Sequence, residues 1–254
     1  MVTPTGHAPG AGKAQERTRR VLGPVTRKVW NIDVSGFERL PESGPAILCP
    51  NHISFLDSMF LMLTVPRNIS FVGKAEYMDS WKTKFLFPAM GMIPIDRSGG
   101  RSSEAALTAE ADALERGHLF GIFPEGTRSR DGLLHKGHTG AARLALTTGC
   151  PLFPVGVIGT ADIQPPDAKM PKLFKTARIR VGQPIDLTHY KRREGDHLVY
   201  RELTDELMYE IRELTGQQYI DRYATKRAET LPTDVAKVRL GEPADREPEL
   251  ARAG

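Results

Sequence analysis

The sequence has little of what defines several classes of protein. Its 254 residues include only two cysteines, Cys49 and Cys150, and these do not form a C-x-x-C pair. Two separate thiols cannot build a disulfide framework, so we expect a protein of a reducing compartment. Residues 1–20 lack the apolar core of a signal peptide, and no run of about 18 apolar residues occurs. We therefore expect a cytoplasmic protein that does not span a bilayer.

The composition also lacks the bias of a disordered or low-complexity chain. Hydrophobic residues make up 40% and charged residues 26%, which is typical of a globular protein. A chain of this length can bury a substantial core without covalent cross-links. We predict a disordered tail at residues 1–12, a basic amphipathic segment at 13–40, one folded domain at 41–225 and a flexible charged tail at 226–254.

The net charge of +4 comes from the start of the chain. Residues 1–40 carry seven basic and three acidic side chains, and the remainder is balanced. Val21, Leu22, Val25 and Val29 have the spacing of one helical face, which Gly23-Pro24 is expected to interrupt. This segment either packs on the folded body or lies on an anionic membrane surface. Nucleic acid is not expected as a partner, because the basic residues lack interleaved aromatics and a recognition motif.

Between residues 41 and 185, short apolar runs alternate with helical patterns. The expected strands are Ala46–Cys49, Ile69–Gly73, Met92–Ile95, Leu119–Phe123, Leu152–Ile158 and an edge strand at Arg178–Val181. The expected helices are Ser103–Arg116, Thr139–Thr148 and His197–Leu214. Apolar strands that alternate with helices indicate an α/β fold, in which helices cover a central, mostly parallel sheet.

A first polar cluster follows the strand Ala46–Cys49 and contains Asn51, a candidate substrate-binding residue, with His52 and Asp57. Histidine is suited to proton transfer near neutral pH, and a carboxylate can fix its tautomer. Residues five apart on one helix point about 140° apart, so the pair can meet only if His52 lies in the turn and Asp57 in the first helical turn. Alternatively, Asp57 only complements the helix dipole and His52 is a surface residue.

A second cluster, Phe123–Ser129, follows the apolar run at Leu119. Ligands of open α/β sheets bind beyond the carboxyl ends of strands. Gly126 permits close backbone approach, Thr127 offers a hydroxyl, and Arg128 offers a fork matched to phosphate. Glu125 either positions a substrate or braces an arginine, and a polar turn without function is the alternative.

Two further cations follow strands in the same manner. Arg97 comes after Met92–Ile95 and Lys74 after Ile69–Gly73. Both are candidate phosphate ligands, and for Arg97 an ion pair with Asp96 or Glu125 is the alternative.

Together these pieces resemble the glycerophospholipid acyltransferase family, whose bacterial type member is 1-acylglycerol-3-phosphate acyltransferase. The resemblance covers residues 40–185 and lies in four blocks in the family's order: Asn51-His52-x4-Asp57, Gly91-x-Ile93-x-Ile95-Asp96-Arg97, Phe123–Ser129 and Leu152–Val157.

The resemblance implies an acyltransferase in which His52 is the general base and Asp57 orients it. The acceptor is then a lysophospholipid, 1-acylglycerol 3-phosphate first of all, whose phosphate is held by Arg97, Arg128 and the backbone at Gly126 and Thr127. The donor is acyl-CoA or acyl carrier protein, with no other cofactor and no metal. Backbone N–H groups near the start of the helix after His52 would stabilise the oxyanion. The family includes enzymes of other acceptors, namely glycerol 3-phosphate, ornithine lipids and glycolipids. Many members begin with hydrophobic helices that anchor them in the bilayer, whereas this sequence offers only the short basic segment 13–30, so we expect peripheral attachment to the cytoplasmic membrane.

Three other interpretations deserve comparison. Cys49 lies close to His52, but a thiol at the end of a buried strand is usually inert. His135 and His138 have the spacing of metal ligands without a third ligand nearby, so we expect a solvated loop there. A lipid- or CoA-binding protein on the same fold would have no chemical need for both His52 and Asp57.

Overall fold

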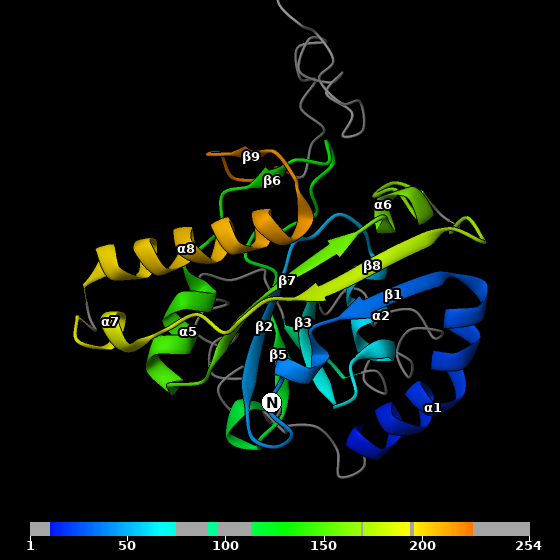
Figure 1. Ribbon diagram of the computed structural model, residues 1–254, viewed down its shortest axis with the longest axis horizontal. Coiled ribbons are helices and arrows are strands. Elements are labelled where there is room, and N and C mark those ends of the chain that lie inside the picture. Colours follow the sequence, from blue (N-terminus) through cyan, green and yellow to red (C-terminus); the bar gives the residue numbers. More distant parts are fainter. Residues whose placement is uncertain (1–10, 75–90, 96–112, 169, 194–195, 226–254) are drawn as a thin grey trace, which may run out of the picture.

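The computed structural model describes residues 11–74, 91–95, 113–168, 170–193 and 196–225, and a seven-stranded sheet forms its centre (Figure 1). The strands lie in the order β1-β8-β7-β2-β5-β3-β4. Their bounds are β1 Asn31–Ser35, β2 Ala46–Pro50, β3 Ile69–Lys74, β4 Met92–Ile95, β5 Leu119–Gly121, β7 Leu152–Ile158 and β8 Thr176–Val181. Neighbouring strands run parallel except β7 and β8, which are antiparallel. The expected α/β fold with a mostly parallel sheet is confirmed.

Helices cover both faces of this sheet (Figure 1). On one face, α5 (Gly140–Thr148) and α8 (His197–Thr215) bury apolar side chains against β2 and β7. On the other face, α2 (Leu56–Thr64) and α6 (Thr160–Ile163) do the same. Every residue of the central strand β2 is therefore buried. The remaining elements are the short helices η1 (Phe37–Arg39) and α7 (Thr188–Lys191) and a small parallel pair, β6 (Leu134–His135) with β9 (Tyr219–Ile220).

The expected edge strand at Arg178–Val181 is wrong in its position. β8 lies inside the sheet between β7 and β1, and β1 is the edge strand that the sequence did not reveal. Residues of β8 alternate between exposed and buried. The alternation of polar and apolar residues therefore means that one face of the sheet at β8 is exposed to solvent, as is common for antiparallel strands. It does not mean that β8 lies at an edge.

The N-terminal helix is longer than its sequence suggests. α1 runs from Ala11 to Val29 without a break and includes Pro24, which we expected to interrupt it. Proline removes one helical N–H, and an exposed position such as this one lets water satisfy the carbonyl left without it. α1 packs on α2 through Gly23 and Thr26, both of which are buried.

Two predictions fall partly or wholly outside the described residues. Of the helix expected at Ser103–Arg116, only the last turn is described. The expected tails at 1–12 and 226–254 lie almost entirely outside. Among the described helices, none combines the length and the apolar character that crossing a membrane requires.

Candidate active site

The His52 turn, residues 51–57, connects β2 to α2 at the carboxyl edge of the sheet. His52 lies in the turn and Asp57 in the first turn of α2, which is the arrangement that the five-residue spacing required. His52 Nδ1 lies 2.9 Å from Asp57 Oδ2. The ring of His52 stacks on Phe123, with 3.8 Å between centroids, and the side chain is 18% exposed. The imidazole is therefore held on two sides and still reachable from solvent.

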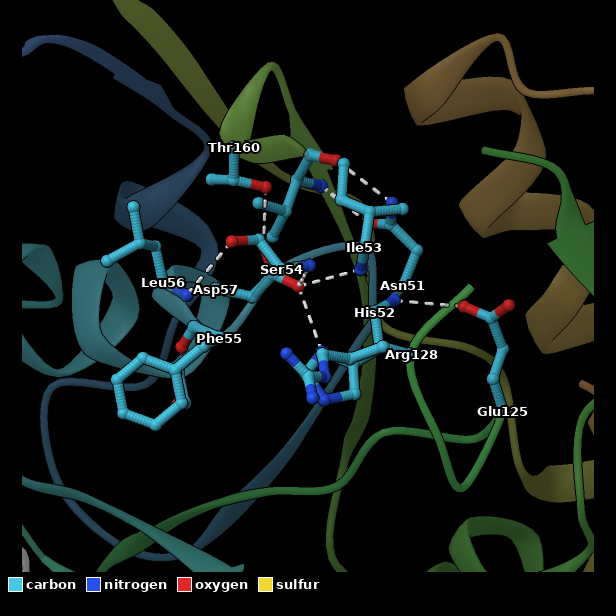
Figure 2. A network of polar contacts seen from close by, with 12 residues as sticks. Asn51, His52, Ile53, Ser54, Phe55, Leu56, Asp57, Glu125, Arg128 and Thr160 are labelled. Carbon is cyan, nitrogen blue, oxygen red and sulfur yellow. Dashed lines mark hydrogen bonds and ion pairs between the residues drawn. The ribbon is translucent and has the colours of Figure 1, made fainter. Parts of the chain in front are cut away.

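Asp57 is fully buried, and four donors surround its carboxylate (Figure 2). Besides His52, the backbone N–H groups of Ile53 and Ser54 donate to Oδ2, each at 2.8 Å. Thr160 Oγ1, at the start of α6, donates to Oδ1 at 2.5 Å. These donors satisfy the oxygens of the buried carboxylate and fix its orientation toward the imidazole.

Those contacts change one expectation about the oxyanion. We expected the first N–H groups after His52 to be available for a substrate oxyanion. The N–H groups of Ile53 and Ser54 instead bind Asp57, and the N–H of Leu56 donates to Ser54 Oγ at 3.2 Å. They hold the turn in shape and do not form a donor site for substrate.

Asn51 fixes the other end of the turn. Its side-chain amide makes two hydrogen bonds with the backbone of Val157 in β7, at 2.9 and 2.7 Å. It also donates to Gln217 Oε1 at 2.8 Å, and Gln217 Nε2 donates to the carbonyl of Gly132 at 2.8 Å. Asn51, predicted as a substrate-binding residue, is completely buried and thus supports the turn from within.

The Glu125 segment, residues 125–130, lies directly against the His52 turn. Glu125 Oε1 accepts the N–H of His52 at 2.9 Å (Figure 2). The N–H of Ser129 donates to the carbonyl of His52 at 2.7 Å. Both backbone polar groups of His52 are thus bound by this one segment. The two clusters that the sequence placed at separate strand ends form a single site.

Glu125 has a role that differs from both of the expected ones. It is fully buried, and its second oxygen accepts the N–H of His135 at 3.0 Å. Burial raises its pKa to about 7, although the two backbone N–H donors favour the charged form. Instead of facing a substrate or an arginine, the carboxylate joins the His52 turn to β6.

Arg128 and its neighbours form the more open part of the site. Arg128 Nη1 donates to the carbonyl of Pro166 at 2.9 Å, and the side chain is only partly buried. Arg130, next along, pairs with the exposed Asp167 at 2.7 Å. Gly126 has φ +70°, a conformation that favours glycine, and Thr127 is half-buried.

Two predicted phosphate ligands are not placed by the structure. Lys74 ends β3 at the same edge of the sheet, but its side chain is outside the described part of the chain. Arg97 lies outside the described residues altogether.

The C-terminal segment around β9 is the part of the site that the sequence did not indicate. His135 contacts Asp131 through Nε2 and the carbonyl of Arg222 through Nδ1, and His138 stacks on Tyr223. Asp131 and His138 are exposed, as expected of a solvated loop, and the hydrogen bond to Asp131 raises the pKa of the half-buried His135. Thr160 and Gln217 were missed because they lie more than 100 residues from the turn that they hold.

Cys49 lies in the apolar core on the face of α5, where it is completely buried. This burial fits the structural interpretation of the thiol. The groups that can perform chemistry are the solvent-accessible imidazole of His52, which the buried Asp57 orients, and the partly buried guanidinium of Arg128 on the neighbouring segment. Such a site can remove a proton from a hydroxyl and hold an anion next to it.

Comparisons with known proteins point to one family. The sequence pattern that defines the family described as Acyltransferase matches residues 31–158. A chloroplastic 1-acyl-sn-glycerol-3-phosphate acyltransferase from Brassica napus is 29% identical over 180 residues, which are 67% of this chain and 52% of that protein. A chloroplastic enzyme of the same name from Arabidopsis thaliana is 31% identical over 157 residues, 61% of this chain and 44% of that protein. The chain thus spans about half the length of these curated relatives.

One solved structure shares the fold. The crystal structure of the 1-acyl-sn-glycerophosphate acyltransferase from Thermotoga maritima superposes with a TM-score of 0.60 at 22% sequence identity, over 79% of this chain and 81% of that one. An uncharacterised protein of Mycobacterium tuberculosis is also similar, at 27% identity over 229 residues, 74% of this chain and 62% of that protein.

Proposed function

This chain belongs to the acyltransferase family, and we propose that it transfers a fatty acyl group from a thioester donor to a hydroxyl of a lysophospholipid. The proposed acceptor is 1-acylglycerol 3-phosphate, which gives phosphatidate as product. The donor is acyl-CoA, with acyl carrier protein as the alternative. The observation that carries the proposal is the contact between His52 and the buried Asp57, 2.9 Å long, beside the segment that holds Arg128.

In the proposed reaction His52 is the general base. Asp57 binds Nδ1, so the lone pair at Nε2 is available for a proton. Nε2 takes the proton of the acceptor hydroxyl while the hydroxyl oxygen attacks the thioester carbon. The tetrahedral intermediate then collapses, the C–S bond breaks, and the thiolate leaves with the proton from the imidazolium. No covalent enzyme intermediate forms.

Arg128 holds the phosphate of the acceptor in this proposal. Its guanidinium has one hydrogen bond to the Pro166 carbonyl, which leaves further N–H donors for a phosphate. The N–H of Thr127 lies next to it in the chain, whereas the N–H of Gly126 already donates to the carbonyl of Phe123 at 3.0 Å. The similarity to relatives named for 1-acyl-sn-glycerol-3-phosphate supports a phosphate-bearing acceptor.

We also propose that the protein works at the cytoplasmic face of an anionic membrane without crossing it. α1 carries six basic residues and one acidic residue, and its Val21 and Val25 are 65% and 54% exposed. A helix with exposed apolar and basic residues together suits an anionic interface.

The test is a thiol-release assay with purified protein. Acyl-CoA and acyl carrier protein are offered in turn with lysophosphatidate, glycerol 3-phosphate and a lyso-ornithine lipid. We expect release of CoA thiol that depends on lysophosphatidate and a product that is phosphatidate by mass. Release with another acceptor alone would reassign the substrate. Tight binding of acyl-CoA without turnover for any acceptor would favour the lipid- or CoA-binding alternative.

A further inference from the structure

The loop between α6 and β8 exposes three large apolar side chains within five residues. Met170 is 79%, Leu173 54% and Phe174 82% exposed. Isolated exposed apolar residues are ordinary, but a contiguous group usually marks an interaction surface. We call residues 170–175 the Phe174 loop.

The backbone of the Phe174 loop is held firmly while its side chains point outward. The N–H of Lys172 donates to the carbonyl of Ile163 at 2.8 Å, and the indole of Trp30 donates to the carbonyl of Lys172 at 2.8 Å. Phe174 has φ +57°, a left-handed conformation that is costly for an aromatic residue. The loop therefore holds a strained backbone conformation in which the phenyl ring faces solvent, and it is not a loosely packed connection.

Hydrogen bonds join the loop to the end of α1. The N–H of Phe174 donates to the carbonyl of Val29 at 3.1 Å, and the N–H of Asn31 donates to the carbonyl of Lys175 at 3.1 Å. The exposed Val21, Leu22 and Val25 precede this junction by one to two helical turns. The exposed apolar groups of the helix and of the loop therefore belong to one continuous part of the structure.

Basic side chains predominate around these groups, although the exposed Asp167 of the same loop pairs with Arg130 and Asp33 lies opposite Arg178 in the sheet. Residues 17–30 include five basic side chains and residues 170–181 include four, and neither stretch contains an aspartate or a glutamate. Lys172 and Lys175 flank Leu173 and Phe174 directly, and both are exposed. Apolar tips surrounded by cations complement a surface that is apolar inside and anionic at its boundary.

The loop lies at the same edge of the sheet as the candidate active site (Figure 1). β8 is antiparallel to β7, so the loop before β8 lies where β7 and β2 end. The segment that leads into the loop also contacts the site, because Ser54 Oγ donates to the carbonyl of Gln164 and Arg128 to that of Pro166. A surface that received the Phe174 loop would therefore lie beside Arg128.

We propose that the Phe174 loop docks into the interface of an anionic lipid bilayer. Met170, Leu173 and Phe174 enter the boundary between headgroups and acyl chains, Lys172 and Lys175 contact anionic headgroups, and the outer face of α1 lies on the same surface. This inference rests on the proposed function, since it gives the site access to an acceptor that resides in the bilayer.

The test is co-sedimentation of the full chain with vesicles of phosphatidylcholine alone and of phosphatidylcholine mixed with phosphatidylglycerol. The triple variant Met170→Ser, Leu173→Ser, Phe174→Ser should lose about tenfold or more of its partitioning into mixed vesicles. The double variant Lys172→Glu, Lys175→Glu should lose the preference for anionic vesicles. The matched control is Leu198→Ser, Tyr209→Ser on α8, which replaces side chains that are 65% and 54% exposed and should bind as the parent protein does.

Two further measurements separate the outcomes. Phe174→Trp should show stronger quenching by brominated lipids than the parent protein, which reports insertion directly. Sedimentation velocity of the triple variant tests self-association through the same face. The proposal is overturned if the triple variant binds vesicles as well as the parent protein does. It is also overturned if the parent protein is a dimer, the triple variant is a monomer, and the triple variant still binds vesicles.

Failure of the docking proposal is distinguishable from failure of the reaction. With a short-chain lysophosphatidate below its micelle concentration, the triple variant should release thiol at the parental rate. If the parent protein releases no thiol with any acceptor but still binds anionic vesicles through this loop, the reaction assignment fails and the docking surface stands.

Discussion

The His52 turn lies against the Glu125 segment, yet the polar side chains of the turn and the two arginines of the segment are used in opposite ways. In the turn, the side chains of Asn51 and Asp57 are completely buried, and each makes several hydrogen bonds within the protein. In the segment, Arg128 and Arg130 make single contacts near the surface. A base must be oriented before the substrate arrives, whereas a ligand-binding cation must be able to exchange partners. The comparison predicts that changes in the turn act on kcat and that changes at the arginines of the segment act on KM.

The strongest way to break this comparison is to disable the base. His52→Ala and Asp57→Asn should each lower kcat by about 10³-fold or more, because proton removal and the Nδ1–H tautomer are lost. The KM for the acceptor should change little. Steady-state kinetics on protein of parental thermal stability measure both. A variant of His52 that keeps the parental kcat would remove the base assignment.

Glu125 joins the two regions, and its effect should depend on pH. Burial raises its pKa from 4.5 to about 7, so the stability that its neutral form contributes is complete below pH 4.5 and lost as pH rises to 7. The free energy of unfolding should therefore fall, relative to Glu125→Gln, by about 3 kcal/mol over that range. Urea unfolding of both proteins at several pH values measures this difference. Parallel pH profiles would contradict it.

Arg128→Ala should sharpen the comparison from the side of the segment. Loss of a charge-assisted phosphate contact costs about 1.5–3 kcal/mol, so the KM for lysophosphatidate should rise about ten- to a hundredfold with kcat nearly unchanged. Arg130→Ala is the matched control, since Arg130 already pairs with Asp167 at the surface and should matter much less. Equal effects of the two variants would place the phosphate elsewhere.

The smallest expected effect concerns Gln217, which holds the turn from outside. Gln217→Ala removes the bridge between Asn51 and Gly132 and should lower kcat about three- to tenfold, the cost of roughly one hydrogen bond. Gln218→Ala is the control, because Gln218 is exposed and pairs with Leu134 through its backbone carbonyl. A rise in KM alone, or the same loss in both variants, would show that Gln217 does not position the turn.

Features of the fold and the site could be predicted from the sequence where the residues that form them lie close together in the chain. The strands Met92–Ile95 and Leu152–Ile158 and the His52–Asp57 contact depend on residues close in the chain, and local pattern was sufficient for them. The edge strand β1 could not be found, because it is polar in part and exists by pairing with β8, about 145 residues later. Its position in the sheet depends on packing that no local pattern records.

The role of Glu125 escaped prediction for a different reason. Its partners are two backbone N–H groups, of His52 and His135, and backbone donors are present at almost every residue of any sequence. A carboxylate that binds a main chain leaves no side-chain partner to look for. The motif therefore indicated that Glu125 belongs to the site and not what it holds there.

The ends of the described fold lie at opposite edges of the sheet, and this affects how the protein can be handled. α1 starts where β3 begins, with Gln15 bonded to the backbone of Ile69, whereas Tyr223 stacks on His138 next to Glu125. A fluorescent label attached at Thr225 would therefore lie beside the reaction centre. One attached at Ala11 would lie at the far edge of the sheet, which makes this residue the better place to tether the enzyme in an assay.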